Sequence, residues 1–89
     1  APILYTANHI FSYIELDEQH AIIEVAVPED WQGRSIGELD IRRKYGVNIL
    51  GVKRENKTDV NISPETVLDA DMTLLVLGEN QKLKKHFRL

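Results

Sequence analysis

A short polar segment near the middle of the chain carries the residue types best suited to ligand binding. Asp40, Ile41 and Arg42 stand in a row, further cations follow in the basic run 42–44, and Asn48 comes shortly after it. Arginine and asparagine can donate to phosphate oxygens, and a carboxylate can accept from an exocyclic amine. With an aliphatic side chain as a flat apolar wall, this combination suits a planar, anionic ligand.

A structural interpretation of the same segment stays open. The basic run 42–44 stands near the expected end of a helix, where cations stabilise the helix dipole. Ile41 follows Leu39 by two residues, which is about 200° around a helix and therefore out of phase with it. Either the helix breaks near Asp40 and a new turn begins, or Ile41 is exposed.

Other chemistry finds little support in the sequence. His9, His20 and His86 lack the converging partners that a zinc site requires, so we expect surface or edge histidines. The glycines are scattered rather than gathered into a phosphate loop, and no serine has the context of a nucleophile. The acidic run 69–71 indicates a turn, with calcium binding as the alternative. We therefore expect no enzyme, no catalytic residue and no metal or cofactor site in this chain.

Composition indicates one folded domain. The chain has 89 residues, 43% of them hydrophobic and 28% charged, which is ordinary for a soluble domain. Fourteen acidic residues outweigh eleven basic ones, which argues against a general nucleic-acid binder. There is no cysteine, no signal peptide and no apolar run long enough to span a bilayer, so we expect a cytoplasmic location. The start at Ala1 without a methionine indicates a piece of a longer protein.

The first half of the chain predicts strands followed by a capped helix. Residues 20–27 alternate between apolar and mixed positions, as a half-buried strand does, and a short strand at 12–16 can pair with them through the acidic turn 17–19. Ser35 and Glu38 match the capping box that opens a helix, and Gly46 is its expected end. Residues 3–13 are expected to form a short connecting helix.

The second half predicts three more strands and a final helix. The strands are expected at 47–54, at 59–62 after a turn at 55–57, and at 72–77, where Gly78 closes the last one. Pro64 lies in a turn at 63–66, and the tail 79–89 forms an amphipathic helix on which Leu83 and Phe87 are partners. The result is an α+β domain, a small mixed β-sheet packed with two or three helices.

The order and spacing of several short motifs carry a resemblance to a known family. An apolar strand, a Gly-x-Ser-Ile-x-Glu-Leu helix start, a strand ending in a cation, a proline turn and an acidic residue before a last apolar strand occur in turn. The residues concerned are Gly33, Ser35, Ile36, Glu38, Leu39, Arg54, Pro64, Asp71 and Gly78. From about residue 12 to residue 78 the chain resembles the C-terminal domain of regulators of potassium conductance, the RCK_C or TrkA-C domain. It looks most like that of the Ktr-type gating subunits of Gram-positive bacteria.

This resemblance implies an organisation and a function. Residues 1–11 would connect to an absent upstream domain that binds ATP or NAD, residues 12–79 would form the RCK_C domain, and residues 80–89 a C-terminal helix. The domain would be a homodimer that binds cyclic di-AMP across its two-fold axis and thereby inhibits potassium uptake. Through the full-length protein it would act on a membrane transporter subunit, at the inner face of the cell membrane, without contacting nucleic acid.

The resemblance also assigns roles to six residues of this chain. Each adenine would lie against apolar side chains, an adenine amine would donate to a carboxylate, and a cation and an amide would hold the phosphates. The six residues, in that order, are Ile36, Ile41 and Pro64, then Asp40, then Arg42 and Asn48. The alternative is a dimerisation module that transmits conformation from the upstream domain and has no nucleotide ligand.

Overall fold

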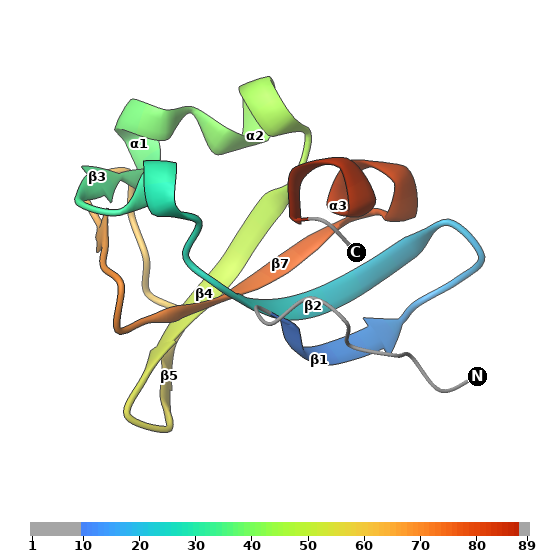
Figure 1. Cartoon of the computed structure of the whole chain (residues 1–89), viewed down its shortest axis with the longest axis horizontal. Coiled ribbons are helices and arrows are strands. Elements are labelled where there is room, and N and C mark those ends of the chain that lie inside the picture. Colours follow the sequence, from blue (N-terminus) through green and yellow to red (C-terminus); the bar gives the residue numbers. More distant parts are fainter. Residues whose placement is uncertain (1–9, 88–89) are drawn as a thin grey trace.

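A five-stranded antiparallel sheet forms the centre of the domain (Figure 1). The computed structural model describes residues 10–87. The strands follow the order β1-β2-β7-β4-β5, and their bounds are Ile10–Glu15, His20–Ala26, Thr73–Glu79, Asn48–Arg54 and Lys57–Asp59. All neighbours in this sheet run antiparallel. The predicted α+β class is confirmed, but the sheet is antiparallel rather than mixed.

The two central strands show why the alternating sequence pattern predicted a half-buried strand. β2 and β7 pair along their whole length, from His20 opposite Glu79 to Ala26 opposite Thr73. Every second side chain of β2 is fully buried, and the others are partly exposed. Because successive side chains of a strand point to opposite faces, only one face of the sheet carries the main core.

Helices cover that face, as Figure 1 shows for α1, α2 and α3. The helical elements are one 3₁₀ turn, η1 at Glu29–Trp31, and three α-helices, α1 at Ile36–Leu39, α2 at Ile41–Tyr45 and α3 at Asn80–Phe87. Their buried side chains join the apolar face of the sheet in one core. A small antiparallel ribbon, β3 at Arg34–Ser35 and β6 at Val67–Leu68, lies beside α1. The sequence had predicted neither strand of this ribbon.

The hairpin between β4 and β5 is tighter than expected. Glu55 and Asn56 both have positive φ, at 53° and 65°, which is the conformation of a two-residue hairpin turn. Lys57 therefore pairs directly with Arg54, and β5 ends at Asp59. The prediction of a strand at 59–62 was wrong because the turn closes within two residues.

Gly78 lies inside β7 rather than closing it. A Cβ atom at this position would lie 2.8 Å from Cγ1 of Val47 and 3.3 Å from Cδ2 of Leu83. Those distances are shorter than ordinary van der Waals contact, so the close approach of Val47 and Leu83 to β7 requires a glycine here. The sequence showed the glycine but not the neighbours that demand it.

The prediction was right for the C-terminal helix and wrong for the described part of the N-terminal segment. The C-terminal helix is confirmed over Asn80–Phe87, with Leu83 and Phe87 buried on one side of it. The short helix predicted at 3–13 is wrong for residues 10–13, which belong to β1, and its remainder falls outside the described residues. The expected boundary between residues 11 and 12 lies within β1 and stays a prediction.

Candidate functional site

A left-handed residue divides the predicted helix into α1 and α2. Asp40 has φ 50° and ψ 49°, and its backbone N–H donates to the carbonyls of Ile36 and Gly37. Its own carbonyl accepts from the N–H of Lys44, so the same residue ends one helix and begins the next. Aspartate is among the few residues that tolerate this conformation. The helix therefore breaks at Asp40, which is one of the two outcomes that the sequence left open.

The break turns Ile41 into the core. Its side chain is only 2% exposed and joins Leu39 in the main hydrophobic cluster. A continuous helix would have directed these two residues to different sides, and the left-handed residue between them resets the phase. The interpretation of Ile41 as an exposed apolar wall is therefore wrong for its side chain.

The start of α1 is tied to the proline turn. The Glu38 N–H donates to Oγ of Ser35 over 3.1 Å, which confirms the predicted hydroxyl cap. The N–H of Gly37 donates to the Pro64 carbonyl over 2.8 Å, and a Cβ at Gly37 would lie 2.9 Å from the Cβ of Pro64. Ile36 is half-buried, and its backbone N–H donates to the carbonyl of Thr66. The structure thus brings the proposed apolar contacts Ile36 and Pro64 to one place.

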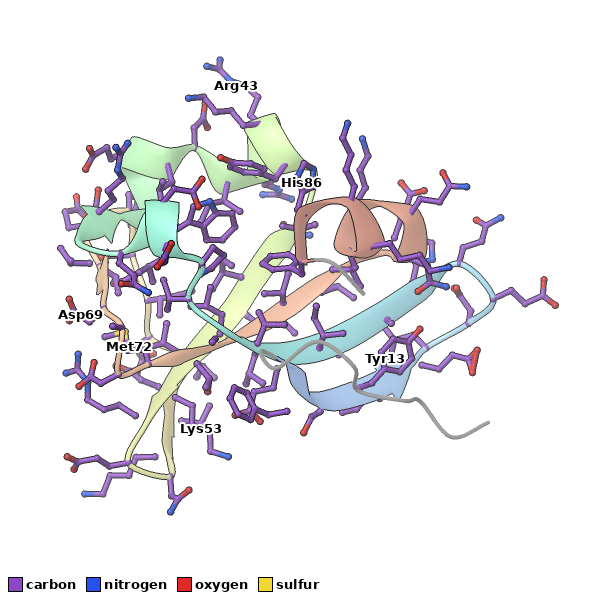
Figure 2. The ribbon with its side chains drawn as sticks, in the orientation of Figure 1. Tyr13, Arg43, Lys53, Asp69, Met72 and His86 are labelled. Atoms are coloured by element: carbon purple, nitrogen blue, oxygen red, sulfur yellow. The ribbon has the colours of Figure 1, made fainter. Side chains whose placement is uncertain are left out.

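The cations of α2 have different partners. Nε of Arg43 lies 2.8 Å from Oδ2 of Asp40, an ion pair within the first turn of α2. Arg42 and Lys44 are exposed and form no ion pair within residues 10–87. Figure 2 shows Arg43 projecting outward from the helix. Arg42 can therefore offer its guanidinium to an anion, while Arg43 holds the carboxylate.

Asn48 belongs to the sheet rather than to the helices that carry Asp40 and Arg42. It is the first residue of β4 and stands directly opposite Leu77, whereas the next pair is Ile49 and the fully buried Val76. Directly opposed residues share a face of the sheet, and successive residues alternate. Asn48 therefore points to the face away from the helices, and α2 lies on the other one.

The aromatic residues of α2 and α3 join the two helices. The rings of Tyr45 and His86 meet edge to face at 4.8 Å, and Trp31 lies between Tyr45 at 5.0 Å and Phe87 at 5.6 Å. At the end of α2, a Cβ on Gly46 would lie 3.5 Å from Cε of Lys82. These ring contacts could not be predicted from the sequence, because the aromatic residues are far apart in the chain.

His86 is the histidine whose environment changes its chemistry. Burial beside the ring of Tyr45 lowers the pKa of His86, and the charges of Lys85 and Lys82 lower it further. The imidazole is therefore held neutral at pH 7, in contact with the helix that carries the basic run 42–44. Figure 2 shows its label between α2 and α3.

We expect His86 to titrate below the ordinary histidine value of about 6.5 in an NMR pH series. Between the lowered pKa and the ordinary one, the unfolded chain binds more protons, so the folded state loses stability as the pH falls. The variant Lys85→Gln should raise this pKa, because it removes one of the two charges, and His86→Gln identifies the signal. A titration at or above the ordinary value in the wild type would contradict the assigned contacts.

The acidic run 69–71 has a structural partner that the sequence did not reveal. Nη2 of Arg54 lies 2.8 Å from Oδ2 of Asp69, and its Nε lies 3.2 Å from Oδ2 of Asp71. The predicted turn is present, since the N–H of Met72 donates to the Asp69 carbonyl. Within residues 10–87 no group of three metal-ligating side chains gathers. Two of the motif residues, Arg54 and Asp71, therefore have a structural role, because their ion pair joins β4 to the turn before β7.

The acidic turn 17–19 is likewise built by local contacts. Asp17 accepts hydrogen bonds from the N–H groups of Gln19 and His20, at 2.8 and 2.7 Å, and its carboxylate lies 3.0 Å from Nδ1 of His20. The backbone N–H of Gln19, followed by the His20 side chain, lowers the pKa of Asp17. His20 therefore holds this turn at the start of β2, a role that the sequence did not predict.

The sequence that forms these helices and strands matches a known family. A family model for the TrkA-C domain matches residues 21–89. The chain belongs to the TrkA-C domain family. The resemblance that the motifs indicated is therefore confirmed, from the middle strands to the C-terminal helix. Within the described residues no helix is both long and apolar enough to cross a bilayer.

Several known proteins resemble this TrkA-C chain. Ktr system potassium uptake protein C of Bacillus subtilis is 33% identical over 81% of the chain and 33% of its own length. A structure of the RCK C domain of KtrA, in complex with cyclic diadenosine monophosphate, has a TM-score of 0.71 and 32% identity over 78% of the chain and 81% of its own. The GsuK RCK domain gives a TM-score of 0.72 at 27% identity, over 84% of the chain and 16% of its own. The chain thus spans about a third of the length of the curated relative.

Proposed function

We propose that this chain is the regulatory domain of a potassium uptake system and binds cyclic di-AMP at a homodimer interface, which inhibits transport. The observation that carries the proposal is the likeness to the KtrA domain, whose structure holds that dinucleotide and which covers most of the chain at 32% identity. The domain would act as a sensor without catalysis. The membrane transporter subunit would be reached through the rest of the protein, at the cytoplasmic side of the membrane.

The geometry supports roles for most of the six proposed residues. Ile36 and Pro64 lie together and are not fully buried, so they can form the apolar wall for an adenine. A carboxylate offers more acceptor sites than one ion pair uses, so Asp40 can pair with Arg43 and also accept from an adenine amine. Because the side chain of Ile41 belongs to the core, this residue would contribute through its backbone.

A phosphate contact needs a cation in an acidic chain. The net charge is −3, and the ligand carries one negative charge on each of its two phosphates. Arg42 is exposed, follows Asp40 by two residues and has no ion-pair partner within residues 10–87. We assign the phosphate to Arg42, because an arginine fork matches phosphate geometry and forms the stronger, charge-assisted hydrogen bonds.

The position of Asn48 supports a shared pocket. It lies on the sheet face away from the helices, whereas Arg42 belongs to α2, which covers the other face. A two-fold interface lets one half of the ligand use residues from both chains, since each chain offers the same surface to its partner. The small core of an 89-residue domain also leaves room for stabilisation by a second copy.

Titration calorimetry tests this proposal through the stoichiometry. A pocket on a two-fold axis binds one dinucleotide for two chains, so saturation is expected near half a ligand per chain. Sedimentation of the same sample should show a dimer at micromolar concentration. One ligand per chain would mean two separate sites and would refute the shared pocket.

The rival function is a dimerisation module that only transmits conformation. It is favoured by the use of Asp40 in an ion pair and of Ile41 in the core, since both are then explained without a ligand. The two functions differ in one measurement. The rival predicts a dimer that gives no heat with cyclic di-AMP, whereas the sensor predicts saturable binding.

A further inference from the structure

Helices α2 and α3 concentrate the positive charge of an acidic chain. Together they carry six of its eleven lysines and arginines and no aspartate or glutamate. Within residues 10–87, Arg43 is the one member of this group that forms an ion pair. The six cations are Arg42, Arg43, Lys44, Lys82, Lys84 and Lys85.

The two helices meet at Tyr45 and His86, and the side chain of Lys82 lies at the end of α2. The ring of Tyr45 contacts the ring of His86, and the side chain of Lys82 runs along Gly46, whose N–H donates to the carbonyl of Arg42. Lys82 and His86 are four residues apart and so share a side of α3. Lys85 follows Lys82 by three residues, so it lies on that same side of α3. The charges of both lysines lower the pKa of His86.

Lys84 differs from these two lysines in its direction. It follows Lys82 by two residues, which places it about 200° around the helix. Like Lys82, it is exposed and belongs to α3. A change at Lys84 therefore alters the net charge of the chain as much as a change at Lys82, but on another side of α3.

We propose that Lys82 and Lys85 extend the proposed site on α2 into one positive surface, which captures the dianionic dinucleotide before it docks at Arg42. This inference rests on the proposed function and adds residues of the C-terminal helix to it. The chain as a whole repels a dianion, so a local field must overcome that repulsion. Fixed charges of one sign raise the association rate of an oppositely charged ligand, and salt suppresses the effect.

Such capture has a kinetic signature that a direct contact lacks. A charge that steers the ligand changes the association rate and its salt dependence, while a buried charged contact changes mainly dissociation. At 0.1 M salt the screening length is about 10 Å, so the effect of Lys82 should fade as potassium chloride is raised further. The salt dependence of the association rate therefore distinguishes capture by α3 from docking at α2.

Stopped-flow association of cyclic di-AMP with the 89-residue chain tests the proposal in low and high potassium chloride. Lys82→Glu is expected to slow association on the order of tenfold in low salt, with a smaller difference in high salt and little change in dissociation. Lys82→Gln, which removes the charge without reversing it, should give part of that loss. Lys84→Glu is the matched control and should change the rate much less.

The outcomes are distinct. Equal slowing by Lys82→Glu and Lys84→Glu would show that only net charge matters and would overturn the directed surface. If Lys82→Glu weakens binding only by raising the dissociation rate, Lys82 is a direct contact, and the proposal of a capturing surface is also overturned. If the wild type binds no dinucleotide at all, the proposed function fails, and that result is visible before any variant is compared.

Discussion

Arg42→Ala should weaken the binding of cyclic di-AMP by roughly 10²-fold or more while the chain stays folded. A charge-assisted hydrogen bond contributes about 1.5–3 kcal/mol, a two-fold pocket uses the residue twice, and each tenfold in affinity is about 1.4 kcal/mol. Arg42 is exposed and has no ion-pair partner among residues 10–87, so its removal leaves no buried group unsatisfied. Calorimetric titration of both proteins measures the difference.

The neighbouring arginine provides the control for this variant. Arg43 is bound to Asp40 and its side chain is 84% exposed, so Arg43→Ala should cost much less affinity. If Arg42 only stabilises the end of α2, its removal lowers the free energy of unfolding by less than about 1 kcal/mol and leaves binding unchanged. Equal affinity of wild type and Arg42→Ala would therefore remove the side chain from the site.

Local sequence signals predicted the regular elements of this fold well. The alternation in β2, the hydroxyl cap at Ser35 and the spacing of Leu83 and Phe87 each follow from one element and its own periodicity. Such signals do not depend on distant contacts. They also led to the correct family, because the order of short motifs is itself a local property.

Features that depend on contacts between distant residues could not be predicted from the sequence. Gly78 is needed inside β7 because Val47 and Leu83 approach it, and Arg54 pairs with Asp69 and Asp71 across β4 and β7. These contacts join residues far apart in the chain, and no periodicity records them. The two-residue strands β3 and β6 were missed for the same reason, since their pairing holds them together more than their own composition does.

The candidate site could be predicted only in part. The sequence placed Asp40 at a break or beside an exposed residue, and a left-handed conformation decided between these outcomes. That decision depends on how well Ile41 packs against the sheet, which no single segment encodes. The ligand roles of the remaining residues follow from the family resemblance, because no periodicity or spacing within the chain encodes them.

Ile41→Ala should lower the free energy of unfolding by about 2–5 kcal/mol, because it deletes a buried side chain and leaves a cavity. Ile41 is 2% exposed within the main core, and small domains are stable by only about 5–15 kcal/mol. Ile36→Ala is the matched control, since the same side chain is only half-buried there, beside the proline turn. Ile36→Ala should lower the free energy of unfolding less than Ile41→Ala does, and it should weaken the binding of cyclic di-AMP more. Urea unfolding of both variants, followed by titration of the folded protein, separates the two roles. A stable Ile41→Ala that no longer binds the dinucleotide would return its side chain to the ligand site and contradict its place in the core.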